Sequence, residues 1–152
     1  MRLAVRAVLL GILALEAVGC GEPQMGNRKE TAPVVGQIVV DGAPPSSPIK
    51  VMCHPVNGMD QENPSVSWCM TGEDSKFEIS TYEAGDGVPP GDYKLTFLWG
   101  TMNVVSMSYG GPDKLGGRYD DPEESEFEFT VQAGEPLDLG QLQLTTKDAA
   151  SK

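Results

Sequence analysis

The sequence predicts an all-β protein: an antiparallel two-layer β-sandwich of about seven strands, preceded by a signal peptide. Short runs that alternate apolar and polar residues recur along the chain, separated by turn-forming clusters at intervals of about eight to twelve positions. The 152 residues include 18 glycines and 12 prolines, which suit the many turns of such a chain. No long amphipathic helical pattern follows residue 20.

Four strands are expected in the first half of the domain, at residues 34–40, 49–54, 65–70 and 77–81. Because side chains alternate between the two faces of a strand, every second residue is expected to face the core. In the third strand this pattern assigns Trp68 to the core and Cys69 to the opposite face. The other expected core positions are Val34, Gly36, Ile38, Val40, Ile49, Val51, Cys53, Val66, Met70, Phe77, Ile79 and Thr81.

The second half contains the most regular strand, at residues 92–99, which is expected to form the centre of the core. Its core-facing residues are Tyr93, Leu95, Phe97 and Trp99. Residues 100–117 are the least regular stretch, with a short edge strand expected at Val104 and Val105. One helical turn is expected at residues 121–124, because an aspartate cap precedes a proline at the first helical position. The last two strands are expected at residues 127–131 and 137–144.

Residues 1–19 have the layout of a signal peptide. Arg2 and Arg6 form a short basic region, and the uncharged run Ala7–Leu15 follows. That run is too short to span a membrane, which takes about 20 apolar residues. Three small residues precede Cys20, and this ending resembles the lipobox of bacterial lipoproteins, with alanine where leucine is usual. The resemblance implies that Cys20 becomes the first mature residue and carries lipid. The alternative is an ordinary signal peptide cleaved nearby.

The mature chain is expected to comprise a lipidated N-terminus and flexible tether at residues 20–32, a β-sandwich domain at 33–145 and a polar tail at 146–152. Without the signal peptide, nine basic and 21 acidic side chains remain, a net charge of about −12. Such a surface repels phosphate backbones and anionic lipid head groups. The charge therefore argues against nucleic acid as a partner, and membrane attachment is expected from acylation at Cys20 alone.

Three ordered motifs carry a resemblance to a known family: residues 35–42 (VGQIVVDG), 85–93 (GDGVPPGDY) and 113–122 (DKLGGRYDDP). Together they resemble the small predicted lipoproteins of planctomycete bacteria, which are similar to carboxypeptidase regulatory-like, transthyretin-like β-sandwich domains. The resemblance implies a fold and a location, a lipid-anchored protein at the periplasmic or outer-membrane face of the cell envelope. That family has no established activity, and the motif residues are typical of turns, so none of them is expected to be functional.

Catalytic and metal sites are poorly supported by the residue pattern. His54 is the only histidine, and no Gly-x-Ser-x-Gly motif accompanies it. Neighbouring Cys53 and His54 point to opposite faces of a strand, which disfavours a zinc site. Met52 and His54 share a face, and soft ligands of this kind suit copper, so copper handling is a distant alternative. The remaining methionines of that hypothesis are Met59, Met70, Met102 and Met107. The acidic residues between 120 and 128 lack a calcium-loop pattern and are expected to form a solvated edge. No metal and no cofactor is expected.

Five aromatic residues raise the alternative of a carbohydrate-binding module, because aromatic rings stack on the apolar faces of sugars: Trp68, Tyr82, Trp99, Tyr109 and Tyr119. Trp68 and Trp99 fall in register with core positions and are expected to be buried. Tyr109 and Tyr119 lie in irregular segments and are the two rings expected to be free to face a ligand.

A disulfide between Cys53 and Cys69 is a further prediction, because they remain as an even pair in an oxidising compartment once Cys20 is lipidated. The expected facing of the strands opposes it: Cys53 falls on the core face and Cys69 on the face opposite Trp68. A cross-strand bridge therefore requires a bulge or an outward Trp68.

The sequence thus favours a non-enzymatic, exported, lipid-anchored binding or structural module of the cell envelope. Its expected partners are the membrane, through the lipid, and an envelope protein or polysaccharide. A row of exposed aromatic residues on one face would favour the carbohydrate-binding alternative, and a concave pocket with convergent polar groups would favour an enzyme.

Overall fold

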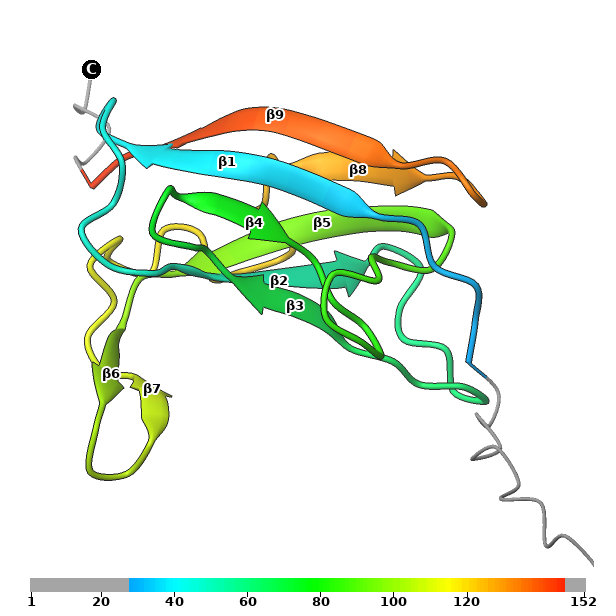
Figure 1. The fold of residues 1–152 in the computed structure, drawn as a ribbon, viewed down its shortest axis with the longest axis horizontal. Helices are drawn as coiled ribbons and strands as arrows, with labels where there is room; N and C mark the ends of the chain where they lie inside the picture. The colour runs from blue at the N-terminus through cyan, green and yellow to red at the C-terminus, as the bar shows by residue number, and fades with distance from the viewer. Residues whose placement is uncertain (1–27, 147–152) are drawn as a thin grey trace, which may run out of the picture.

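A computed structural model describes residues 28–146, which form an all-β domain (Figure 1). The expected all-β class is confirmed: no helix occurs in this range, and so none there is long and apolar enough to span a membrane. The signal peptide, Cys20 and most of the tether precede the described residues. The strands are β1 (Val34–Val40), β2 (Lys50–Pro55), β3 (Ser67–Met70), β4 (Lys76–Glu78), β5 (Gly91–Leu98), β6 (Thr101–Asn103), β7 (Ser108–Gly110), β8 (Glu128–Val131) and β9 (Leu137–Leu144).

Two main sheets lie one above the other in a sandwich-like arrangement (Figure 1). One is antiparallel throughout, with the order β3-β2-β5-β8. The other has the order β4-β1-β9, in which β1 pairs antiparallel with β4 but parallel with β9. The expectation of a wholly antiparallel fold is therefore wrong at β9. A parallel neighbour cannot follow through a tight hairpin, and β9 reaches β1 only after the rest of the domain has intervened.

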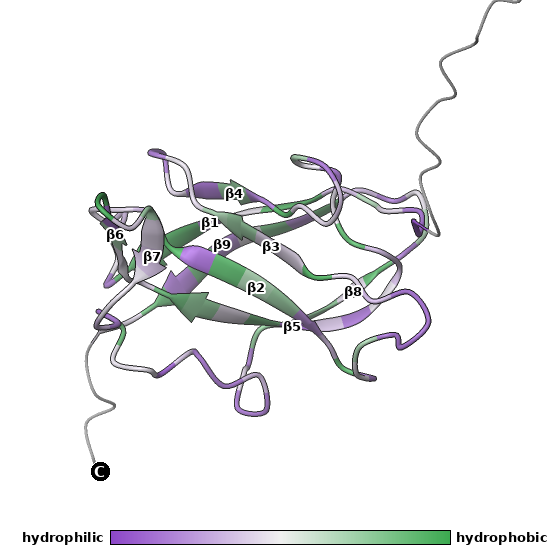
Figure 2. Ribbon diagram, turned by 90° about the horizontal axis from the view of Figure 1, so that it is seen from below, coloured by the Kyte–Doolittle hydropathy of each residue, from purple (hydrophilic) through white to green (hydrophobic). Residues whose placement is uncertain are grey.

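The core fills the space between the sheets and contains the alternating residues that the sequence predicts for β1, β2 and β5. Hydrophobic residues follow these strands in Figure 2. Phe97 is 1% exposed, and its ring meets the rings of Tyr119 and Phe127 edge-on, at centroid distances of 6.2 and 5.1 Å. Ala32, just before the expected start of the domain, is also fully buried, because its main chain pairs with Val88. The expected centre of the core at β5 is confirmed.

The side chains of β3 that face the core are the opposite set from the expected one. Trp68 is 45% exposed, whereas Ser67 and Cys69 are buried. The buried Ser67 hydroxyl forms a 2.7 Å hydrogen bond with the Thr81 hydroxyl. This bond offsets the free-energy cost of burying a polar group in the core. The nitrogen of Lys50 lies 5.5 Å from the centroid of the Trp68 ring on the outer face. The prediction of a buried Trp68 is therefore wrong.

Two local predictions in the irregular region are also wrong. Val104 and Val105 do not form an edge strand; they lie in the turn that joins β6 to β7, a two-stranded hairpin apart from both main sheets. Residues 121–124 form a hydrogen-bonded turn and not a helical turn. The capping role of Asp121 holds, since its carboxylate accepts a 2.8 Å hydrogen bond from the Glu123 amide.

The third sequence motif, residues 113–122, begins with an aspartate that holds a turn. The carboxylate of Asp113 accepts hydrogen bonds from the amides of Trp99, Leu115 and Gly117 at 2.9, 3.0 and 2.9 Å. These bonds fasten the segment after β7 to the end of β5, and Leu115 is buried there. The aspartate of this motif therefore holds the segment in place at the end of β5.

Candidate functional site: a groove between two sheet edges

The candidate site is a groove of about 860 Å³ between β3 and β4. Each of these strands forms the edge of its own sheet, and residues 71–75 join them. Within residues 28–146, a single isolated bridge, between Trp68 and Ser80, crosses this side of the domain. The two sheets therefore diverge at their open edges, and the space between them is the groove.

The strand pairing also determines what the groove edges offer. The Trp68 amide donates outward to Ser80, so strand alternation directs the main-chain groups of Met70 to the same open edge. On the opposite side, the Ile79 amide donates inward to Val34, so the main-chain groups of Glu78 point outward. Both edges thus present peptide groups toward the groove.

Aromatic and charged side chains line this groove together. The exposed ring of Trp68 lies on one side and the half-buried ring of Tyr82 on the other. Lys76 and Glu78 add opposite charges from β4. The Asp74 carboxylate lies 3.3 Å from the side-chain ammonium of Lys76. A hydrogen bond from the main-chain amide of Lys76 lowers the pKa of Asp74. The groove is therefore amphipathic, with flat rings beside hydrogen-bonding groups.

One wall of the groove is a loop held by a single carboxylate. Asp86 accepts hydrogen bonds from the amides of Thr81, Tyr82 and Glu83 at 2.7, 3.0 and 3.1 Å. The Gly85 amide adds a 2.9 Å bond to the Ser80 hydroxyl. Because several amides converge on one side chain, the loop presents Tyr82 in a defined position. This is the role of the aspartate in the second sequence motif.

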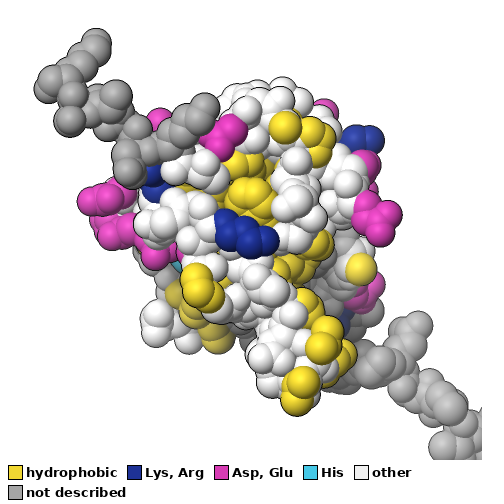
Figure 3. Space-filling view, turned by 90° about the vertical axis from the view of Figure 1, so that its left-hand side faces the viewer, with side chains coloured by type: hydrophobic (Ala, Val, Ile, Leu, Met, Phe, Trp, Pro, Cys, Tyr) yellow, Lys and Arg dark blue, Asp and Glu magenta, His cyan; other side chains and the backbone are white. Residues whose placement is uncertain are grey.

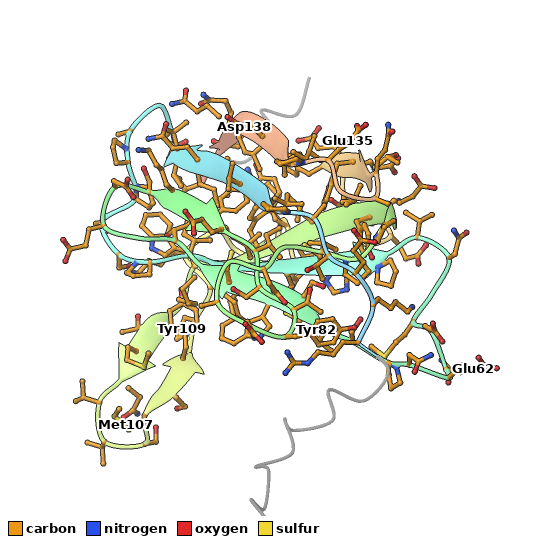
Figure 4. The ribbon with its side chains drawn as sticks, turned by 45° about the vertical axis from the view of Figure 1, so that its right-hand side comes forward. Glu62, Tyr82, Met107, Tyr109, Glu135 and Asp138 are labelled. Atoms are coloured by element: carbon orange, nitrogen blue, oxygen red, sulfur yellow. The ribbon has the colours of Figure 1, made fainter. Side chains whose placement is uncertain are left out.

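The start of the described chain is fastened at the rim of the groove. The guanidinium of Arg28 lies 2.7 Å from the Glu83 carboxylate and 5.4 Å from the centroid of the Tyr82 ring. The Lys29 amide donates a 3.2 Å hydrogen bond to the Tyr82 hydroxyl, and the Lys29 ammonium pairs with Asp60. That pairing is the main cause that lowers the pKa of Asp60 to about 2. Figure 4 shows Tyr82 at the lower side of the domain, near this segment.

The two tyrosines expected to face a ligand have structural contacts instead. The Tyr109 hydroxyl donates to the carbonyl of Pro48 at 2.7 Å and accepts from the Gly100 amide at 2.8 Å. The Tyr119 ring packs against the core, and its hydroxyl accepts a 3.1 Å hydrogen bond from the Thr145 amide. Both tyrosines therefore have structural partners, and a ligand-facing role for either ring stays a prediction. The exposed aromatic side chain is Trp68, which the apolar alternation of its strand had assigned to the core.

Most residues of the copper hypothesis lie on separate elements, although Met70 is on β3, which pairs with β2. Met52 and His54 do share the outer face of β2, where His54 forms a 2.8 Å hydrogen bond with the Thr96 hydroxyl. Partial burial lowers the pKa of His54. Met59, Met102 and Met107 lie in a loop and in the hairpin, on other elements. Within residues 28–146, no group of three histidine, cysteine, aspartate or glutamate side chains could hold a metal ion.

Cys53 and Cys69 are free thiols in this structure, and both point inward. Cys53 is directly opposite Ser67, and Cys69 is opposite Val51, so the thiols are diagonal neighbours across β2 and β3. Burial raises the pKa of both, that of Cys69 to about 12. Trp68 points outward, as a bridge between Cys53 and Cys69 requires. The disulfide itself stays a prediction.

Comparisons with known proteins add little to this description. No family model matches the chain, and no significant match is found among curated proteins. Among solved structures, a 9R-lipoxygenase from Cyanothece PCC8801 is similar to 76% of this chain, with 13% sequence identity and a TM-score of 0.38. The matched region covers 16% of the lipoxygenase chain.

Proposed function

We propose that the chain is an exported, lipid-anchored binding module of the cell envelope, and that it holds its ligand in the groove between β3 and β4. The observation that carries the proposal is the amphipathic groove itself, with an exposed tryptophan at its edge. Large aromatic rings are seldom left exposed without a partner and are the residues that most often dominate binding surfaces. The transthyretin-like type of sandwich, suggested by the motifs, belongs to this proposal.

The lipid anchor rests on the residues before Cys20, which lie outside the described structure. In a host that lipidates, the protein is expected to partition into a detergent phase and with membranes. The variant Cys20→Ala removes the acylated sulfur, so it should leave the detergent phase. Retention of this variant in the detergent phase would contradict the proposed anchor.

A polysaccharide is the ligand class that the groove favours. Trp68 and Tyr82 offer flat rings for the apolar faces of sugar units, while Ser80 and Glu78 offer groups for sugar hydroxyls. The groove is wide open to solvent, which suits a polymer better than a compact small molecule. The proposed module has no catalytic role.

The test uses Trp68→Ala with Val66→Ala as the matched control. Val66 is 48% exposed two residues earlier in the chain but does not line the groove. Envelope polysaccharides in a native gel should retard the parent protein and the Val66 variant. Trp68→Ala should weaken binding by about 30-fold, as expected for a ring that contributes about 2 kcal/mol. Equal retardation of both variants would contradict the proposal.

An extended polypeptide is the second candidate ligand, because the main-chain groups of Met70 and Glu78 point to open edges. Met70→Pro removes the outward amide without removing a bond to β2, and proline is tolerated on an edge strand. Loss of partner binding in Met70→Pro, with retained sugar binding, would favour strand addition. The reverse result would favour the polysaccharide.

A further inference from the structure

The hairpin of β6 and β7 is the most hydrophobic exposed feature of the described domain. Its connecting turn exposes Val104, Val105 and Met107 by 78, 92 and 80%, and Met102 on β6 is 53% exposed. Figure 1 shows the hairpin extending below the two sheets, and Figure 3 shows hydrophobic side chains at its lower tip. None of these side chains packs against the core. Clusters of this kind on a surface mark contact sites.

The hairpin lacks charge in a chain that is otherwise acidic. No charged residue occurs between Lys94 and Asp113, although the whole chain carries a net charge of −11. Charged side chains are the costly ones to bring into an apolar medium, and the tip has none. An acidic domain is repelled by anionic head groups, so a neutral, apolar tip is the part of it best suited to approach a lipid surface.

Two main-chain amides of the turn have a side-chain partner within the hairpin. The side-chain oxygen of Asn103 accepts hydrogen bonds from the amides of Val105 and Ser106 at 3.0 and 3.1 Å, and the hydroxyls of Ser106 and Ser108 are paired at 2.7 Å. Main-chain groups that already have partners can leave water at low cost, a condition for any segment that enters a bilayer. At the base, the Tyr109 hydroxyl ties the hairpin to Pro48 and Gly100, which fixes its direction.

The hairpin and the start of the described chain lie on the same side of the domain, at opposite ends of its longest axis (Figure 1). The described chain begins at Arg28, on the lower side of the domain in Figure 1, the side on which the hairpin extends. Seven residues separate Cys20 from Arg28, and the eight Cα–Cα steps between the two residues span at most about 28 Å. Since Arg28 and Lys29 are held to Glu83 and Asp60, a lipid on Cys20 keeps this side of the domain near the bilayer.

We propose that the tip of the β6–β7 hairpin, formed by Met102, Val104, Val105 and Met107, inserts into the interfacial layer of an uncharged lipid bilayer. It acts as a second membrane contact beside the lipid anchor. The placement rests on the proposed function, because the anchor brings this side of the domain to the membrane. Insertion to the boundary between head groups and acyl chains, about 5–10 Å deep, needs no rearrangement of the main sheets. This contact would add to the attachment expected from the lipid on Cys20.

The test places an environment-sensitive fluorophore at the tip of the full chain. Val105→Cys carries the label, and Glu135→Cys is the control, in the turn before β9 on the opposite side of the domain (Figure 4). The native Cys53 and Cys69 are buried, and their raised pKa values keep them protonated at neutral pH, so the label goes to the new thiol. Vesicles of phosphatidylcholine, with and without a nitroxide high on the acyl chain, are then added.

Insertion predicts a several-fold rise and a blue shift of emission at position 105, quenched by the nitroxide lipid, with no change at position 135. Adding Val104→Asp to the labelled variant should abolish the response, because the new charge would have to leave water. An unchanged signal at position 105, or equal signals at both positions, would overturn the inference. So would a signal that rises with protein concentration before any lipid is added, which would indicate contact between two hairpins.

Flotation of the same vesicles reports on the anchor separately. If the labelled chain fails to float but its tip still responds to lipid, the anchor is wrong and the hairpin contact stands. If the chain floats and the tip stays silent, the anchor stands and the hairpin contact is refuted.

Discussion

Gly87 occupies a position that tolerates no other residue, and its replacement tests how the end of the core is closed. A β-carbon at this position would lie 1.8 Å from the carbonyl oxygen of Ala32 and 2.7 Å from the α-carbon of Pro33. The backbone there has a φ of +89°, in the left-handed region that glycine favours. Gly87→Ala must therefore push the two main-chain segments apart.

The cost of this substitution follows from what the displacement breaks. Two main-chain hydrogen bonds of 3.0 Å join Ala32 and Val88, and both residues are fully buried. The left-handed conformation costs alanine about 1–2 kcal/mol. Two buried hydrogen bonds and partial exposure of two apolar side chains add about 2–3 kcal/mol, so the expected loss is about 3–5 kcal/mol.

Gly58→Ala is the matched control, because Gly58 has a φ of +78° but a β-carbon added there would meet no atom within 4 Å. It carries only the conformational cost, about 1 kcal/mol. Urea unfolding followed by tryptophan fluorescence gives both free energies of unfolding. If Gly87→Ala proves no more destabilising than Gly58→Ala, the tight packing at Ala32 is refuted.

Three further outcomes are expected. Phe97→Ala should lower the free energy of unfolding by about 3–5 kcal/mol, since the ring is fully buried; a loss under about 1 kcal/mol in urea unfolding would contradict its central place. Mass spectrometry of the unreduced protein, alkylated after unfolding, should show a Cys53–Cys69 bond as two fewer hydrogens and no label, whereas two labelled thiols would exclude it. Burial raises the pKa of Tyr93 to about 12, so the protonated phenol is favoured in the folded state. The resulting stability is complete below a pH of about 10 and is lost as pH rises toward 12. The free energy of unfolding should fall across this window, and less so in Tyr93→Phe.

The all-β class and the buried side of the main strands could be predicted from the sequence. In β2 and β5, the buried face is apolar and most residues of the other face are polar, so a period of two identifies the buried side without any knowledge of neighbours. The turns that separate the strands carry glycine, proline or aspartate, whose conformational preferences are local. The aspartates of the second and third motifs were likewise readable as turn residues, although their amide partners were not.

Strand β3 shows why the candidate site could not be predicted from the sequence. Its residues alternate Val66, Trp68 and Met70 with serine and cysteine, and hydrophobicity alone assigns the larger set to the core. The structure buries the smaller set, because Ser67 finds the Thr81 hydroxyl 14 residues away and Lys50 lies over the Trp68 ring. Which face of an edge strand is buried depends on partners that are distant in the chain.

The sequence by itself determined the all-β class, the core of β1, β2 and β5, and the acidic character of the chain, since each depends on residue type and local spacing. Only the tertiary structure decided the parallel pairing of β1 with β9, about 100 residues apart, the groove where β3 and β4 become open edges, and the isolation of the β6–β7 hairpin. These features arise from contacts between distant segments, and an alternation of apolar and polar residues carries no information about which strand lies beside which.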